Sequence, residues 1–297
     1  SSPRRPTAPE RSALLARCCF PASSATVDLA VSGGSDSIGL ALLAREAGLG
    51  ATLHHVDHGL RSEGPKEAAL VASLAERLGA SFESHVVDVS PGPNLEDRAR
   101  RARRGVLPRG TLTAHTMDDQ AETVLLNLLR GSGIDGLAGM SPETKPLLDL
   151  RRAELRDLVV SSGEPYVVDP SNFDLSLRRN LIRARVLPEL CRASGRDLIP
   201  VLARQCGVLR DEAAFLDDAA RAAIDDPWDV ALLRAAPVAL RRRRLRDLAR
   251  SADDAHPPTA DEVDRMDAVV RGDAVATELS GGRRLARRSG RLRLEDE

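Results

Sequence analysis

The chain has 297 residues, a net charge of −1 and 42% hydrophobic residues, so it has room for one large or two modest domains with a real core. With only 2% aromatic residues, that core must consist mainly of leucine, valine and alanine. No apolar run approaches the roughly 20 residues of a membrane span, and no secretory signal opens the sequence. We therefore expect neither a membrane protein nor a secreted one.

The sequence contains four cysteines, which are Cys18, Cys19, Cys191 and Cys206. Their spacing forms neither a C-x-x-C pair nor a metal-binding pattern, so we expect a reduced, cytoplasmic protein. The charges are segregated along the chain, and nearly all basic residues are arginines, which suit bidentate contacts to phosphate. A net charge near zero therefore does not exclude a nucleic-acid partner.

Residues 1–10 lack periodicity and are predicted to be a disordered lead-in. Beyond them, apolar runs typical of buried strands alternate with helical patterns. The expected strands are residues 27–31, 52–56, 82–89 and 111–114. The expected helices are residues 38–47, 65–78, 94–104 and 121–129. This alternation predicts an α/β fold with a parallel sheet, whose ligands bind at the carboxyl ends of the strands.

The second half of the chain is predicted to leave this alternation. Helical patterns cover residues 151–160 and open again at Arg178, and residues 197–224 form one long amphipathic pattern. An arginine run at residues 241–246, which could contact RNA, precedes alternating strand patterns. Those patterns are residues 274–279 and 283–294, and Ser280-Gly281-Gly282 between them reads as a hairpin turn. We predict a catalytic domain (1–195), a connecting helix (196–224) and a small α+β domain (225–297).

The first strand runs into a loop that is suited to phosphate. The candidate ligand-binding residues of this loop are Ser32, Gly33, Gly34, Ser35, Asp36 and Ser37. The two glycines allow positive φ angles and close approach of backbone N–H groups, and Ser35 or Ser37 can cap the helix that follows. A helix N-terminus with free N–H groups binds anions, phosphate above all. An ordinary Gly-Ser turn is the alternative.

Two common phosphate-binding motifs can be excluded because the loop lacks their characteristic residues. No lysine occurs before Lys66, which excludes the Walker pattern, and the dinucleotide fingerprint needs three spaced glycines. Asp36 instead stands beside the expected phosphates. A carboxylate next to phosphate repels it unless a divalent cation bridges the two, so we predict Mg²⁺ at Asp36.

Three histidines and an acid end the second strand, at His54, His55, Asp57 and His58. They invite a zinc interpretation, but adjacent residues of a strand point to opposite faces, so His54 and His55 cannot readily share an ion. Polar tips on a strand end and turn are the simpler explanation.

Two arginine-rich segments are candidates for contacts with phosphate. Residues 94–104 carry five arginines on about three helical turns, more than the helix dipole needs, although a solvated basic face is an alternative. Arg178, Arg179 and Arg183 stack at helical spacing with no acid among them, and we predict that they bind RNA.

A second polar string leads from the fourth expected strand into a helix. His115, Asp118, Asp119 and Glu122 stand close together, and either aspartate can start the helix. Paired carboxylates beside a histidine can hold Mg²⁺, recognise an ammonium group or remove a proton from it. The glycines of residues 131–140 then predict a loop, which either closes over a substrate or only links two elements.

These motifs resemble a known family. Ser-Gly-Gly-Ser-Asp-Ser is similar to the signature of the PP-loop ATP pyrophosphatases. His-Val-Asp-His-Gly-Leu-Arg at residues 55–61 and the His115 string resemble the tRNA(Ile)-lysidine synthetases, as do Pro-Leu-Leu, Asp-Pro-Ser-Asn and Arg-Asn-x-Ile-Arg further on. The resemblance runs from about residue 27 to residue 190. Thr116 replaces the second histidine that the family commonly has.

The resemblance implies a PP-loop enzyme that uses ATP and Mg²⁺ to join free lysine to the wobble cytidine of isoleucine tRNA with a CAU anticodon, through an adenylated cytidine. It implies that Asp36 holds Mg²⁺ beside the pyrophosphate, that Asp119 and Glu122 grip and deprotonate the lysine amine, and that His115 and Arg98 steady the nucleotide or phosphate. Residues 96–100 resemble the family's acid-Ala-x-Ala-Arg element, which implies that either Arg98 or Arg100 is the site residue of this helix. The alternatives are a tRNA thiolase, which needs cysteines that are not paired here, or a non-catalytic RNA-binding relative. The oligomeric state stays open, a dimer included.

Overall fold

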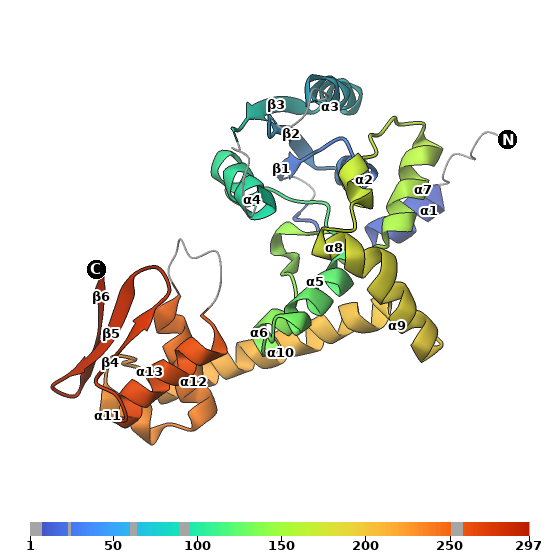
Figure 1. Ribbon diagram of the computed structural model, residues 1–297. Coiled ribbons are helices and arrows are strands. Elements are labelled where there is room, and N and C mark those ends of the chain that lie inside the picture. The colour runs from blue at the N-terminus through green and yellow to red at the C-terminus, as the bar shows by residue number, and fades with distance from the viewer. Residues whose placement is uncertain (1–7, 23–24, 60–63, 89–94, 251–257, 297) are drawn as a thin grey trace. The chain divides into compact units, whose positions relative to one another are not determined.

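The computed structural model describes residues 8–22, 25–59, 64–88, 95–250 and 258–296 (Figure 1). The chain divides into two compact units, Ser1–Gly207 and Val208–Glu297, with the boundary inside the long helix α10 (Ile199–Ala223). Among the described residues, no helix combines the length and the apolar character that crossing a bilayer requires.

The first unit is built around a parallel sheet in the order β1 (Thr26–Ala30), β2 (Gly50–Asp57) and β3 (Ser81–Val86). The fourth expected strand, residues 111–114, is wrong as a strand. Leu112 forms a single parallel bridge to Leu29, with Leu112 N–H donating to Asp28 O and Ala30 N–H donating to Leu112 O. Thr113 N–H then donates to Thr144 O, so the chain leaves the sheet after one residue.

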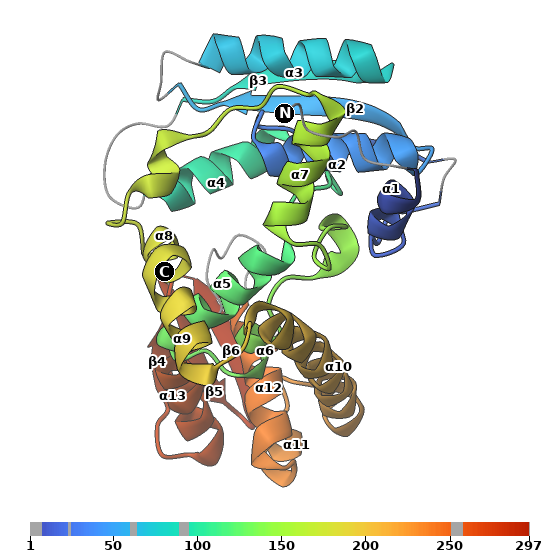
Figure 2. The same cartoon turned by 90° about the vertical axis from the view of Figure 1, so that its right-hand side faces the viewer.

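Helices make up most of the rest of the first unit. Those of the first unit are α1 (Ala8–Leu15), α2 (Ser35–Glu46), α3 (Gly64–Leu78), α4 (Leu95–Val106), α5 (Met117–Leu129), α6 (Ile134–Leu137), α7 (Arg152–Ser162), α8 (Arg178–Leu181) and α9 (Leu187–Ser194). Short turns of other helical types are Pro142–Thr144, Pro170–Phe173 and the π-helical Ile182–Val186. Figure 2 shows α3 and α4 on opposite sides of the strands. The α/β fold and the leucine-, valine- and alanine-rich core are confirmed.

The strand order explains where a ligand can bind. The bridge at Leu112 lies on one side of β1, and β2 and β3 lie on the other. The connections that follow β1 and Leu112 therefore diverge at this point. In open α/β sheets such a switch point creates a crevice at the carboxyl ends of the strands.

Several local expectations are wrong in detail. Residues 8–10 begin α1 instead of belonging to a disordered lead-in, since Pro9 and Glu10 suit a first helical turn. Neither Ser35 nor Ser37 caps α2: Gly34 is the N-cap residue, so both serines lie within the first turn. The predicted loop at residues 131–140 contains α6.

The second unit combines helices with an antiparallel sheet. Its elements are the end of α10, α11 (Val230–Ala235), α12 (Val238–Ala249), α13 (Ala260–Arg271), β4 (Ala276–Leu279), β5 (Arg283–Arg288) and β6 (Arg291–Asp296). The hairpin between β4 and β5 is confirmed, but the second expected strand is itself a hairpin. Ser289 and Gly290, both with positive φ, make the turn between β5 and β6. In the arginine run, Arg241 and Arg243 are buried in ion pairs with Asp267 and Asp217.

Candidate active site

A cavity of about 790 Å³ opens at the switch point of the first unit. Its volume lies in the range of small-molecule sites. Its walls come from the loop after β1, the end of β2, the segment before α5, α4, α7 and residues 166–169. The cavity is therefore lined by motifs that are far apart in the sequence. It lies at the carboxyl ends of the strands, where these motifs were predicted to meet.

The loop after β1 is fixed by hydrogen bonds within it and by one from residue 167. Gly33 has a φ of +85°, which favours glycine, and its carbonyl oxygen accepts a hydrogen bond from Val167 N–H at 2.9 Å. Ser37 Oγ donates to Gly34 O at 2.9 Å and accepts from Ser32 N–H at 3.2 Å. The hydroxyl of Ser37 thus fixes the loop from inside, and α2 starts directly behind it.

Asp36 projects from the first turn of α2 toward α7. Its Oδ2 lies 3.3 Å from Arg152 Nε, and Ser35 Oγ donates to its Oδ1 at 3.4 Å. Burial raises the pKa of Asp36 to about 6, and the nearby Asp119 adds to this, although Arg152 opposes it. The carboxylate is therefore poorly compensated, and a further cation beside it would stabilise its charged form.

The two carboxylate oxygens of Asp119 have different partners. One caps a helix, and the other faces the arginines at the cavity. Oδ2 accepts from the backbone N–H and the hydroxyl of Thr116, both at 2.8 Å, in a capping box that starts α5. Oδ1 faces Arg152 Nη2 at 2.8 Å and Arg179 Nη2 at 3.4 Å. Thr116, where the resembled family commonly has a histidine, thus serves as the helix cap.

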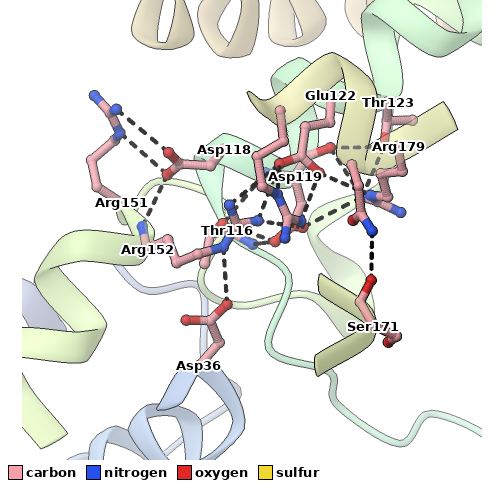
Figure 3. Close-up of polar contacts among 12 residues, drawn as sticks. Asp36, Thr116, Asp118, Asp119, Glu122, Thr123, Arg151, Arg152, Ser171 and Arg179 are labelled. Carbon is pink, nitrogen blue, oxygen red and sulfur yellow. Dashed lines mark hydrogen bonds and ion pairs between the residues drawn. The ribbon is translucent and has the colours of Figure 1, made fainter. Parts of the chain in front are cut away.

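Glu122 lies one helical turn further along α5, beside Asp119 (Figure 3). Its side chain is 1% exposed. Arg183 Nε donates to its Oε1 at 2.6 Å and Arg179 Nε to its Oε2 at 2.9 Å, while Arg152 Nη1 lies 3.3 Å away. Arginines from α7, α8 and the π-helical turn thus converge on carboxylates of α5 and α2. We call Asp36, Asp119, Glu122, Arg152, Arg179 and Arg183 the pocket cluster.

The acids and arginines of the pocket cluster stabilise one another's charged forms. Burial alone would raise the pKa of Asp119, but Arg152 and Arg179 lower it to about 2. Burial likewise lowers the pKa of Arg152, and Asp119, Glu122 and Asp36 raise it by more. Asp119 is therefore ionised at neutral pH, and its charge depends on arginines that the chain brings from elsewhere.

His115 stands between the sheet and α5, and Thr113 Oγ1 lies 2.9 Å from its Nδ1. Burial lowers the pKa of His115 to about 4, and Arg179 and Lys145 act in the same direction against Asp119. At neutral pH its imidazole is uncharged, so it is a hydrogen-bonding group and not a cation. It lines the cavity, as expected for a residue that contacts a ligand.

Some residues that are neighbours in the sequence have different partners in the structure. Asp118 turns away from Asp119 and Glu122: it accepts from Arg151 Nε at 3.2 Å and from Arg152 N–H at 2.9 Å, at the start of α7. Arg178 is exposed, whereas Arg179 and Arg183 face Glu122. Asp118 therefore holds the helix that carries Arg152.

On α4, Arg103 lines the cavity and Arg98 is not among its lining residues. Arg98 nevertheless has buried Nε and Nη2 atoms without a hydrogen-bond partner in the described part of the chain. Buried polar atoms are rarely left unpaired, so an anionic partner suits them. The sequence identified the helix but not which arginine reaches the cavity.

Two residues that sequence reasoning did not select also shape the site. Arg152 contacts three carboxylates of the pocket cluster. An available signal was Arg151-Arg152 at a helix start, where the dipole disfavours cations. His55 lines the cavity, its Nδ1 lies 3.1 Å from Val31 O, and its buried Nε2 has no partner among the described residues.

The fold and site define a PP-loop protein, a class that binds ATP. Residues 9–190 match the family model of the PP-loop domain. The solved structure of the U34-tRNA thiolase NcsA from Methanococcus maripaludis shares this fold, with a TM-score of 0.55 over 68% of this chain and 78% of that one, at 17% identity.

Sequence relatives narrow the class further. The tRNA(Ile)-lysidine synthase of Salinispora tropica is 38% identical over 89% of both chains, and that of Nocardia farcinica is 36% identical over 93% of both. The enzyme of that name from Thermus thermophilus is 43% identical over 74% of this chain and 48% of its own length. The chain belongs to the tRNA(Ile)-lysidine synthase family. It spans about half the length of the Thermus relatives.

Proposed function

We propose that the protein uses ATP to ligate free lysine to the wobble cytidine of an isoleucine tRNA with a CAU anticodon. The observation that carries this proposal is the acid pair of α5. Asp119 lines the same cavity as the PP-loop, and the buried Glu122, one helical turn on, contacts Arg152 and Arg183, which also line it. A PP-loop alone accounts for ATP cleavage to AMP. The acid pair supplies a place for an amine, which a simple nucleotide-binding protein does not need.

The reaction has two steps. The carbonyl oxygen of the cytosine attacks the α-phosphorus of ATP, the bond to the β-phosphate breaks, and pyrophosphate leaves. The ε-amine of lysine then attacks the activated ring carbon, AMP leaves with the former carbonyl oxygen, and the nitrogen loses a proton. The cytidine has to leave the anticodon stack to reach the cavity.

In the first step, the loop from Ser32 to Ser37 holds the leaving pyrophosphate with backbone N–H groups and the start of α2. Asp36 fits Mg²⁺, because Mg²⁺ is commonly bound by one or two carboxylates together with substrate phosphates, and because the partly buried Asp36 lines the cavity with a pKa of about 6. When bound, the ion would neutralise charge on the pyrophosphate. His115 steadies the nucleotide from the cavity wall, and His55 Nε2 can accept a hydrogen bond from its base. Arg98, which does not line the cavity, offers its buried, unpaired Nε and Nη2 atoms to an anion at α4.

In the second step, Asp119 Oδ1 and Glu122 receive the lysine ammonium group and take its proton. Both are paired with arginines before lysine binds. An incoming ammonium can replace one guanidinium without leaving an acid unpaired, which keeps the exchange electrostatically balanced. The guanidinium that is replaced, that of Arg179 or of Arg183, can then turn toward the phosphates of the tRNA, beside the exposed Arg178.

The test is a product assay. The protein is incubated with Mg-ATP, labelled lysine and isoleucine tRNA with a CAU anticodon, and the nucleotide product and the labelled RNA are identified. We expect AMP, pyrophosphate and lysine attached to the tRNA. Methionine tRNA, which has the same anticodon letters, serves as the specificity control. Formation of ADP, or tRNA without lysine, would overturn the proposal.

A further inference from the structure

Three metal-ligating side chains meet on one face of the sheet. His54 of β2 pairs in register with Glu83 of β3, and His85 lies two residues beyond Glu83, so all three side chains project from the same face. His54 Nδ1 lies 3.0 Å from His85 Nε2 and 3.5 Å from Glu83 Oε2, and the latter two atoms are 3.9 Å apart. No sequence motif groups these residues, because strand pairing alone brings them together.

These separations match the spacing of ligands around a small metal ion. Zinc binds imidazole nitrogen and carboxylate oxygen at about 2.0–2.2 Å, so two ligands of a tetrahedral ion lie about 3.3 Å apart. The three measured separations lie on both sides of this value. One Zn²⁺ can therefore contact all three atoms after shifts of a few tenths of an ångström.

Asp28 of β1 orients the central histidine. Its Oδ1 lies 2.9 Å from His54 Nε2, and the side chain of His54 is 1% exposed. A carboxylate accepts from Nε2–H, so in the neutral ring the lone pair is on Nδ1, which is the atom directed at Glu83 and His85. Histidine ligands of metals usually have such a carboxylate or carbonyl partner behind them.

We propose that Asp28, His54, Glu83 and His85 form a site for a divalent transition-metal ion, of which Zn²⁺ fits best. His54, Glu83 and His85 bind the ion directly, and Asp28 fixes His54. Two carboxylates balance the charge of the ion. Glu83 is 59% exposed and His85 22%, so the ion has a path from solvent and a position for a water ligand.

This site is distinct from the one proposed for Mg²⁺. Mg²⁺ prefers oxygen ligands, whereas two of the three ligands here are imidazoles. The site also differs from the zinc interpretation of the sequence. His55, which follows His54, turns to Val31 O on the other side of β2. A direct hydrogen bond between the stacked rings of His54 and His85, 5.3 Å apart, is the competing explanation of their contact.

Metal binding to the full, tag-free chain tests the proposal. Zn²⁺ affinity is measured by equilibrium dialysis, and Co²⁺ absorption reports the ligand set. We expect one Zn²⁺ per chain, with at least tenfold weaker binding in Glu83→Gln and His85→Ala and about 10- to 100-fold weaker binding in Asp28→Asn. Zn²⁺ should also raise the melting temperature of the wild type and not of these variants.

The control is Glu189→Gln, which removes an exposed carboxylate of α9 by the same substitution as Glu83→Gln and should leave the affinity unchanged. Glu83 is exposed, so Glu83→Gln tests the site even if His85→Ala fails to fold. Absence of a stoichiometric ion in the wild type would overturn the proposal. So would equal affinities for the wild type and Glu83→Gln, which would leave only the hydrogen bond between the histidines.

Discussion

Arginine and carboxylate meet in both units of the molecule, but in different ways. In the second unit, Arg241 Nε donates to Asp267 Oδ1 at 2.6 Å, and both side chains are almost completely buried. Arg241 Nη1 also donates to Ala236 O at 3.3 Å. In the pocket cluster, by contrast, each arginine contacts more than one acid, and Asp36, Asp119, Arg152 and Arg183 line an open cavity.

The difference separates a structural use of arginine from a functional one. A buried guanidinium that is bound to a buried carboxylate and to backbone acceptors has no access to a ligand, so it contributes to the fold. Arginines that share acids beside a cavity can trade one partner for a ligand at small cost. Arginine content alone does not distinguish these cases, although both come from runs of basic residues in the sequence.

The largest expected effect concerns the buried ion pair of Arg241 and Asp267, whose role we take to be structural. Asp267→Asn leaves Arg241 charged and buried without its carboxylate, so the free energy of unfolding of the second unit should fall by about 3–5 kcal/mol. Urea denaturation measures this change. Asp218→Asn breaks the exposed pair with Arg221 and should cost less than about 1 kcal/mol. Equal losses in the two variants would contradict the distinction.

The next effect tests the shared arginine of the cavity. Arg152→Ala removes contacts to Asp36, Asp119 and Glu122, and the rate of lysine attachment at neutral pH should fall about 10²- to 10³-fold. Burial of Asp119 is then less opposed, so its pKa rises from about 2. The acid limb of the pH–rate profile should consequently move to higher pH. A uniform loss at all pH values would show that Arg152 only supports the fold.

The smallest effect concerns the free energy of unfolding, which the charge of Asp36 lowers at neutral pH. The pKa of Asp36 is about 6 in the folded protein and ordinarily 3.8, so the folded state binds the extra proton between these values and stability falls as pH rises through them. Asp36→Asn should therefore stabilise the protein at pH 7.5 by about 1–2 kcal/mol and lose this advantage near pH 4. Chemical denaturation at the two pH values measures it, and a destabilised variant at pH 7.5 would contradict the charge assignment.

What the sequence predicts here is what lies close together in the chain. The loop after β1 works through Gly33, Ser37 and the start of α2, all within a few residues, so the motif contained the geometry. Asp119 and Glu122 are one helical turn apart, and their shared orientation followed from that spacing. The alternation of strands and helices was likewise enough to predict the parallel sheet.

What the sequence missed depends on distant partners. The local sequence pattern does not predict that Arg179 pairs with Glu122, which is 57 residues away. Nor does it predict that Arg241 pairs with Asp267 instead of contacting RNA. The strand at residues 111–114 failed for the same reason, since Thr113 N–H finds its acceptor in Thr144. The one usable signal was Arg151-Arg152 at a helix start, because an unfavourable charge there needs a compensating partner.

The central claim is that the loop after β1 activates the cytidine and the acid pair of α5 handles the amine. Two partial reactions, tRNA-dependent exchange of pyrophosphate into ATP and transfer of labelled lysine to tRNA, test it in Glu122→Gln and Asp36→Asn, with thermal unfolding measured on the same samples. We predict that Glu122→Gln retains exchange and loses transfer, while Asp36→Asn loses both. A folded Glu122→Gln variant that loses exchange, or that still transfers lysine, would contradict the account.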